Sequence, residues 1–284
     1  PSPTIQVPSG TFFLSNVLSN DGTGPMLRFK NLGSGSTGNA TLVEARSGAG
    51  TASRLLVDCG LGIRILTQRL AQAGLVPGEL NGIFITHEHA DHVGCVLSLA
   101  LRARIPVWMS RGTFMAMGEP DFDGLLRLAH DTEPFTVGDL LLNPFTVPHD
   151  AREPLQLSCT DGDTRLGILT DLGHATPHVL AALQGCHTLL LESNHDPDLL
   201  AASGYPAFLQ RRISGNLGHL ANDAAAGIAQ QLRHPGLRQV VAAHLSRQNN
   251  RPDLAQAALA QALGCSAQDI AVAHPQDGTD WITA

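Results

Sequence analysis

The chain has 284 residues, of which 43% are apolar and 15% charged, and its formal net charge is −7. This balance excludes a protein coated in nucleic-acid-binding charge but leaves local basic patches open, and the length allows one large domain or two small ones. Five scattered cysteines without a C-x-x-C pair exclude a disulfide framework, and no apolar run reaches the roughly 18 residues that span a bilayer. We expect a soluble, cytoplasmic protein whose oligomeric state is open.

Residues 1–25 differ in composition from the rest of the chain. They contain four prolines and four serines but no basic residue, and they lack the positive start and continuous apolar stretch of a secretory signal. Met26 is suited to be a natural start. We expect residues 1–25 to be a leader, an alternative-start extension or an expression remnant, and residues 26–284 to form a single domain.

The first part of this domain alternates short apolar runs with turns. Strands are predicted over 26–32, 40–45 and 54–58, and a helix over 62–73 follows from its apolar spacing. The Gly-rich segment Gly33–Asn39 joins the first two strands. It could be a phosphate-binding loop, but the lysine of a P-loop is absent, so a tight hairpin is the favoured interpretation.

The most informative stretch is Gly82–His92. Three apolar residues and a threonine lead into five ionisable side chains within six positions, namely His87, Glu88, His89, Asp91 and His92. In an extended segment residues i and i+2 point the same way, so the first two histidines can grip one ion while the later residues turn toward a second. The alternative is a polar loop that merely caps a helix, which we expect over 91–103.

The remaining elements form two similar β-rich halves with helices outside. A strand over 106–109 and an irregular stretch to 134 are followed by further expected strands at 135–137, 140–147, 155–160, 165–170, 188–192, 239–243 and 269–274. Expected helices lie at 177–183, 222–232 and 252–263. This order predicts an α/β fold, a four-layer αβ/βα sandwich.

Four further candidate ligands stand where apolar strands end: His149, Asp171, His195 and His244. Any one of them alone is more often an ordinary loop residue. Together with the Gly82–His92 motif they predict a metal site, because folds of this kind build sites from the same ends of several strands.

The pattern His-x-His-x-Asp-His, followed by a distant His, an Asp and a final His, resembles that of the metallo-β-lactamase superfamily. More narrowly, the chain resembles the YycJ (WalJ) group of metal-dependent nucleases. The segments that carry this resemblance are Gly33–Asn39, His149-Asp150-Ala151, Thr170-Asp171-Leu172-Gly173, Glu192-Ser193-Asn194-His195-Asp196, Gly218-His219-Leu220-Ala221-Asn222 and His244-Leu245-Ser246-Arg247-Gln248-Asn249-Asn250.

The resemblance implies a fold, a ligand set and a reaction. One divalent ion would be held by His87, His89 and His149, a second by Asp91, His92 and His244, with Asp171 bridging them. All are nitrogen or oxygen ligands, which suit Zn²⁺, Mn²⁺ or Fe. Two such ions, roughly 3.5–4 Å apart, would activate a hydroxide for phosphodiester hydrolysis.

Three side chains are candidates for proton transfer. Asp91 could orient the hydroxide or accept its proton, and His219 or His195 could protonate the leaving oxygen. Both histidines have a structural alternative as helix-capping or ligand-supporting groups.

The substrate is indicated by a local excess of arginine. Residues 201–252 contain six arginines against one acid, Asp223, and we expect Arg211, Arg212 and Arg247 to bind phosphate. The favoured function is a DNA exonuclease, in a site that is open or covered by residues 195–220. The alternatives are a hydrolase of a small thioester, lactone or cyclic phosphate, and a metal-binding protein without hydrolytic activity.

Overall fold

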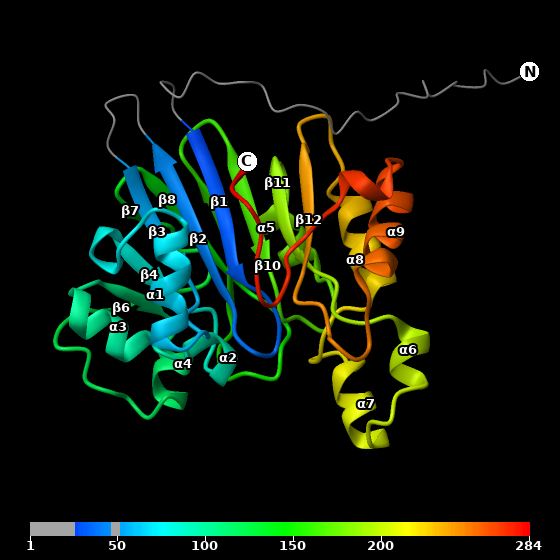
Figure 1. Cartoon of the computed structure of the whole chain (residues 1–284), viewed down its shortest axis with the longest axis horizontal. Helices are drawn as coiled ribbons and strands as arrows, with labels where there is room; N and C mark the ends of the chain where they lie inside the picture. The colour runs from blue at the N-terminus through cyan, green and yellow to red at the C-terminus, as the bar shows by residue number, and fades with distance from the viewer. Residues whose placement is uncertain (1–25, 47–51) are drawn as a thin grey trace, which may run out of the picture.

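A computed structural model describes residues 26–46 and 52–284, which form two face-to-face β-sheets with helices outside (Figure 1). The first sheet has the order β14 (Ile282–Thr283), β1 (Met26–Gly33), β2 (Ala40–Arg46), β3 (Ala52–Val57), β4 (Gly82–Phe84), β5 (Val107–Met109) and β6 (Leu126–Leu128). The second has the order β13 (Ala271–Val272), β12 (Gln239–Ala243), β11 (Thr188–Glu192), β10 (Arg165–Leu169), β9 (Leu155–Thr160), β8 (Leu140–Thr146) and β7 (Phe135–Val137).

The helices lie on the outer faces of the two sheets. In Figure 1, α1 (Ile63–Gln72) and α3 (Val96–Ala103) lie outside the first sheet, and α8 (Asn222–Gln231) and α9 (Pro252–Leu263) outside the second. The shorter helices are α2 (Ala90–Val93), α4 (Arg111–Ala116), α5 (Pro177–Leu183), α6 (Pro197–Ala201) and α7 (Ala207–Ile213), with 3₁₀ turns at Pro77–Glu79 and Ala267–Asp269.

Three apolar layers separate these four layers of structure. One lies between the sheets and includes Phe29 and Ile168; a second joins the first sheet to α1 through Leu66; a third joins the second sheet to α8 and α9 through Ile228 and Leu259. This is the predicted four-layer αβ/βα sandwich, which is therefore confirmed.

Each sheet is antiparallel on one side and parallel on the other. Strands β3 to β6 and β10 to β13 are parallel. Strands β10, β11 and β12 are almost wholly buried because sheet or helix covers both faces, which explains their continuous apolar sequences. Their carboxyl ends lie along one edge, so polar residues that follow them are brought together.

Most predicted elements are found within a residue or two of their expected ends, including the β1–β2 hairpin around Gly33–Asn39. The prediction of a single helix over 91–103 is wrong. It is divided into α2 and α3 at Gly94, whose φ is +23° and whose hypothetical Cβ would lie 2.5 Å from the Cys59 carbonyl oxygen. Close packing against a distant segment thus ends the helix.

Other corrections concern short elements. The stretch to residue 134 contains α4 and β6, the stretch after β11 contains α6 and α7, and the last expected strand shrinks to β13. Elements of this length carry too few apolar repeats to be recognised by periodicity.

Several expectations concern the chain as a whole. Residues 1–25 lie outside the described part, and the single domain over 26–284 stays a prediction. Cysteines Cys59, Cys95, Cys159 and Cys186 are buried and free, as expected for core residues. Within 26–46 and 52–284, none of the helices has the length and apolar content needed to cross a membrane.

Candidate metal centre

The candidate ligands lie just beyond the carboxyl ends of strands from both sheets. Three residues in these turns, Asp58, Asp171 and His244, have φ values of 64°, 57° and 56°. The left-handed conformation is uncommon for residues other than glycine and is often found at functional sites. It turns the chain sharply at the strand end, where it places these polar side chains in the interior.

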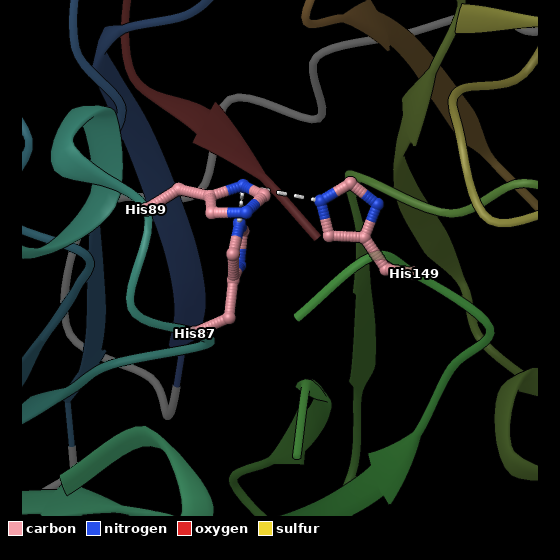
Figure 2. Close-up of side chains that lie close together, drawn as sticks. All are labelled: His87, His89 and His149. Atoms are coloured by element: carbon pink, nitrogen blue, oxygen red, sulfur yellow. Dashed lines mark hydrogen bonds between the residues drawn. The ribbon is translucent and has the colours of Figure 1, made fainter. Parts of the chain in front are cut away.

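The first group of ligand atoms belongs to His87, His89 and His149 (Figure 2). His87 Nε2 lies 3.1 Å from His89 Nδ1, and His149 Nε2 lies 3.3 Å from the same atom. A tetrahedral ion with bonds of about 2.0–2.1 Å to nitrogen would separate its ligands by roughly 3.3 Å. The imidazoles therefore have the spacing of ligands around one ion.

The second group contains Asp91, His92 and His244, with Asp171 beside it. Asp91 Oδ2 lies 3.7 Å from His92 Nε2 and 3.8 Å from His244 Nε2, and Asp171 Oδ2 lies 3.0 Å from His92 Nε2. Asp171 also falls within a group with His87 and His92. Its carboxylate thus stands between the two groups.

The donor atoms fit divalent ions. Among the described residues, His244 Nε2 is buried without a hydrogen-bond partner, and Asp171 Oδ2, although 3.0 Å from His92 Nε2, is buried without a well-aligned hydrogen bond. Such orphaned atoms cost free energy unless a cation or proton satisfies them. The set contains imidazole nitrogens and carboxylate oxygens but no thiolate, which is compatible with Zn²⁺, Mn²⁺ or Fe²⁺.

Each of four histidines has its other ring nitrogen fixed by a neighbour. The four contacts are His87 Nδ1 to Thr86 Oγ1 at 2.9 Å, His92 Nδ1 to Asp58 Oδ2 at 2.8 Å, His149 Nδ1 to the Gly218 carbonyl at 3.1 Å and His244 Nδ1 to Glu192 Oε1 at 3.0 Å. Donation of the Nδ1 proton leaves the Nε2 lone pair directed at the cluster. Such partners orient metal ligands and raise their basicity.

The electrostatics of the cluster favour cations. Burial lowers the pKa of His87 well below its usual value, which keeps this imidazole neutral and able to bind. Burial also opposes protonation of His244, but Asp171, Asp91 and Glu192 outweigh it and raise its pKa to about 10. Likewise, burial raises the pKa of Asp171, but His244 and His92 hold it well below its usual range.

A family model described as a β-lactamase superfamily domain matches residues 53–245. Exodeoxyribonuclease YycJ of Bacillus anthracis is 32% identical over 242 residues, which are 84% of this chain and 89% of that protein. Exodeoxyribonuclease WalJ of Streptococcus pneumoniae is 30% identical over 233 residues, 80% of this chain and 85% of that protein. The chain belongs to the metallo-β-lactamase superfamily, in the YycJ and WalJ group.

Solved structures agree with this superfamily at the level of the fold. The metallo-β-lactamase fold protein YhfI from Bacillus subtilis has a TM-score of 0.69 at 17% identity and covers 92% of this chain. Zn²⁺-bound PqqB from Methylobacterium extorquens has a TM-score of 0.65 at 16% identity and covers 90% of this chain. At such low sequence identity, these similarities support the fold alone.

A pocket of about 250 Å³ opens onto the candidate metal centre of this metallo-β-lactamase domain. Its lining includes the candidate ligands His89, Asp91, Asp171 and His244. The lining also includes Tyr205, Leu209, Arg212, Ile213 and His219. Residues of α7 and of the segments on either side of it therefore border the pocket.

The proposed proton donors differ in position. His219 lines the pocket, its Nδ1 lies 2.8 Å from Glu192 Oε1, and its side chain is 24% exposed. Burial lowers the pKa of His219, but Glu192 and Asp171 outweigh it and raise the pKa above its ordinary value. His195 is 2% exposed, is not among the pocket-lining residues, and burial lowers its pKa. The structure therefore brings His219 to the pocket but not His195.

The three candidate arginines also differ. Arg212 lines the pocket, where its Nε donates to Asp150 Oδ2 at 2.7 Å. Arg211 is exposed on the same helix but does not line the pocket. Arg247 borders a separate cavity of about 280 Å³ that shares Leu245 and Ser246 with the metal pocket.

Sequence reasoning missed two buried carboxylates. Asp58 and Glu192 hold His92 and His244, but they were treated as the last residues of strands. Asp58 stands at a strand end, so the test that selected His149 and Asp171 could have found it. For Glu192 the signals were a charged residue closing the apolar run Leu189–Leu191 and its place in a segment that carries the family resemblance.

Proposed function

We propose that this protein is a metal-dependent exonuclease that hydrolyses DNA, with Zn²⁺ or Mn²⁺ at two adjacent positions. The observation that carries the proposal is the pair of ligand groups around Asp171, which adjoin a pocket that Arg212 also lines. The exodeoxyribonuclease relatives, matched over most of their length, support a nucleic acid substrate.

The candidate residues have two kinds of role: some would be metal ligands and others would transfer protons. His87, His89 and His149 would hold one ion and Asp91, His92 and His244 the other, with Asp171 shared. Bound ions would act as Lewis acids: they would polarise the phosphate and lower the pKa of a bound water to about 7. Asp91 lines the pocket, which supports a role in orienting the attacking water and accepting its proton.

His219 carries the second proton transfer. Glu192 accepts a hydrogen bond from His219 Nδ1, which leaves the Nε2 side of the ring available to the pocket. Its raised pKa favours the imidazolium form, which can protonate the departing 3′ or 5′ oxygen. We assign His219 as the general acid and give His195 no part in proton transfer.

Arginines at the rim supply the phosphate contacts. Arg212 and Arg211 lie in the last turn of α7, next to the pocket, and guanidinium groups bind phosphate oxygens through several donors. Arg247 would bind a further phosphate from the neighbouring cavity, which it lines together with Ser246. We also propose a cytoplasmic location, which four buried, free cysteines support.

The test is a substrate panel with the full chain loaded separately with Mn²⁺ and Zn²⁺. End-labelled single- and double-stranded DNA and RNA are compared with a thioester, a lactone and a cyclic nucleotide. We expect progressive shortening of DNA from an end. Inactivity on every nucleic acid beside rapid turnover of one small ester would refute the nuclease assignment.

A further inference from the structure

An aromatic side chain stands uncovered beside the metal pocket. Phe208 is 67% exposed, and it is the only exposed Phe, Tyr or Trp among residues 26–46 and 52–284. The other aromatic side chains of that region are buried or half-buried. Exposing a phenyl ring to water loses the burial energy that aromatic residues ordinarily supply. Single exposed apolar side chains are common, so the significance of Phe208 depends on what surrounds it.

The neighbours of Phe208 connect it to the site. It is on α7, between Tyr205 and Leu209, both of which line the pocket. Arg211 and Arg212 follow three and four residues later, so they lie next to the phenyl ring on the helix surface. An exposed aromatic face, two guanidinium groups and a cation-binding pocket are therefore contiguous.

Helix α7 is fixed to the loop that carries His149. Arg212 Nε donates to Asp150 Oδ2 at 2.7 Å, and the Asp150 backbone N–H donates to the Leu217 carbonyl at 3.0 Å. The Gly218 carbonyl accepts from His149 Nδ1 at 3.1 Å. These contacts hold the exposed ring at a defined place relative to the candidate ligands.

We propose that Phe208 is a stacking platform for a nucleobase of the substrate strand next to the phosphodiester under attack. This inference rests on the proposed nuclease function and adds a specificity-determining residue to it. A nucleotide combines a flat aromatic face with an anionic phosphate, and the phenyl ring beside Arg211 and Arg212 complements both. Stacking is tolerant of sequence because every base has a π-face.

The proposal predicts how substitutions at Phe208 act. F208A should raise KM for a DNA oligonucleotide by about 5- to 150-fold, the range that base–aromatic stacking supports, with a smaller change in kcat. F208W should retain tight binding, whereas F208L, which keeps apolar bulk without an aromatic face, should behave like F208A. Val76→Ala, at another exposed apolar side chain (59% exposed) preceding the 3₁₀ turn Pro77–Glu79, is the matched control.

The decisive measurement uses oligonucleotides with an abasic analogue at each of the terminal positions. The wild-type enzyme, loaded with Mn²⁺, should lose affinity for one abasic position, and F208A should no longer distinguish it from the intact strand. Thermal unfolding of each variant checks that the fold is retained.

The outcomes separate this inference from the function on which it rests. DNA hydrolysis with equal KM values for wild type, F208A and F208L would overturn the stacking role while leaving the nuclease intact. Hydrolysis of bis(4-nitrophenyl) phosphate by the wild type without hydrolysis of any nucleic acid would overturn both. An equal rise in KM in F208A and Val76→Ala would also overturn the inference, because the effect would then come from removing any exposed apolar side chain.

Discussion

Replacing Glu192 by glutamine should weaken the metal centre without touching a ligand. Glu192 is fully buried and accepts four hydrogen bonds, two on each oxygen. Oε1 lies 2.8 Å from His219 Nδ1 and 3.0 Å from His244 Nδ1. Oε2 accepts from the backbone N–H groups of Leu172 and Leu220 at 3.0 and 3.2 Å.

An amide of the same shape can satisfy only one of these two pairs. The backbone donors cannot change, so the glutamine oxygen should remain with them and its NH₂ group should face the two imidazoles. His244 must then carry its proton on Nε2, the atom that faces the cluster, or leave Nδ1 unpaired. Loss of such a supporting partner typically weakens metal affinity 10- to 100-fold, or about 1.4–2.7 kcal/mol.

The assay is calorimetric titration of the metal-free protein with Mn²⁺ and Zn²⁺, combined with denaturant unfolding in EDTA. The matched control is Glu44→Gln, a buried glutamate held by Arg28, Arg46 and Arg54 on β1, β2 and β3. It should lose stability but keep its metal affinity. The reasoning is wrong if E192Q binds both metals as tightly as the wild type does.

Three further predictions follow from the site. H87A and D91A should each abolish metal-dependent hydrolysis while keeping the fold by circular dichroism; activity in both variants would contradict the ligand assignment. H219A should lower kcat by about 10²–10⁴-fold. Because Glu192 raises the pKa of His219, the general acid is lost as pH rises, so E192Q should move the alkaline limb of the kcat profile to lower pH. In the metal-free protein, His244 has its pKa raised from 6.5 to about 10 and stabilises the fold fully below pH 6.5, whereas Glu192, lowered from 4.5 to about 2, does so above pH 4.5. The difference in urea stability between the wild type and H244A, both in EDTA, should therefore be largest between pH 4.5 and 6.5 and shrink above pH 8; a difference that grows above pH 8 would refute this.

The ligands could be predicted because short sequence patterns identify them. His87, His89, Asp91 and His92 are almost contiguous, and His149, Asp171 and His244 each follow an apolar run. The end of a continuous apolar run marks the point where a buried strand leaves the core. The four-layer sandwich follows from the same runs, since fully apolar strands need cover on both faces.

Other features depend on contacts between distant segments. The break at Gly94 follows from its approach to Cys59, and Gly60 lies so close to the Asp91 carbonyl that a Cβ would be 1.6 Å from its oxygen. The helix that carries Phe208 has seven residues, too few for a clear period. Its exposed ring becomes informative only when the pocket beside it is known.

The metal centre also joins the two sheets, which explains why its parts are scattered along the chain. In each ligand group the first sheet supplies some donors and the second sheet completes it, through His149 in one and His244 in the other. The His244 backbone N–H, at a left-handed residue, donates to Ser34 Oγ of the β1–β2 turn at 2.7 Å. Left-handed residues cost about 1–3 kcal/mol each and persist only when surrounding contacts determine them. Neither sheet alone contains a complete site, so the packing of the two sheets and the geometry of the ligands are specified together.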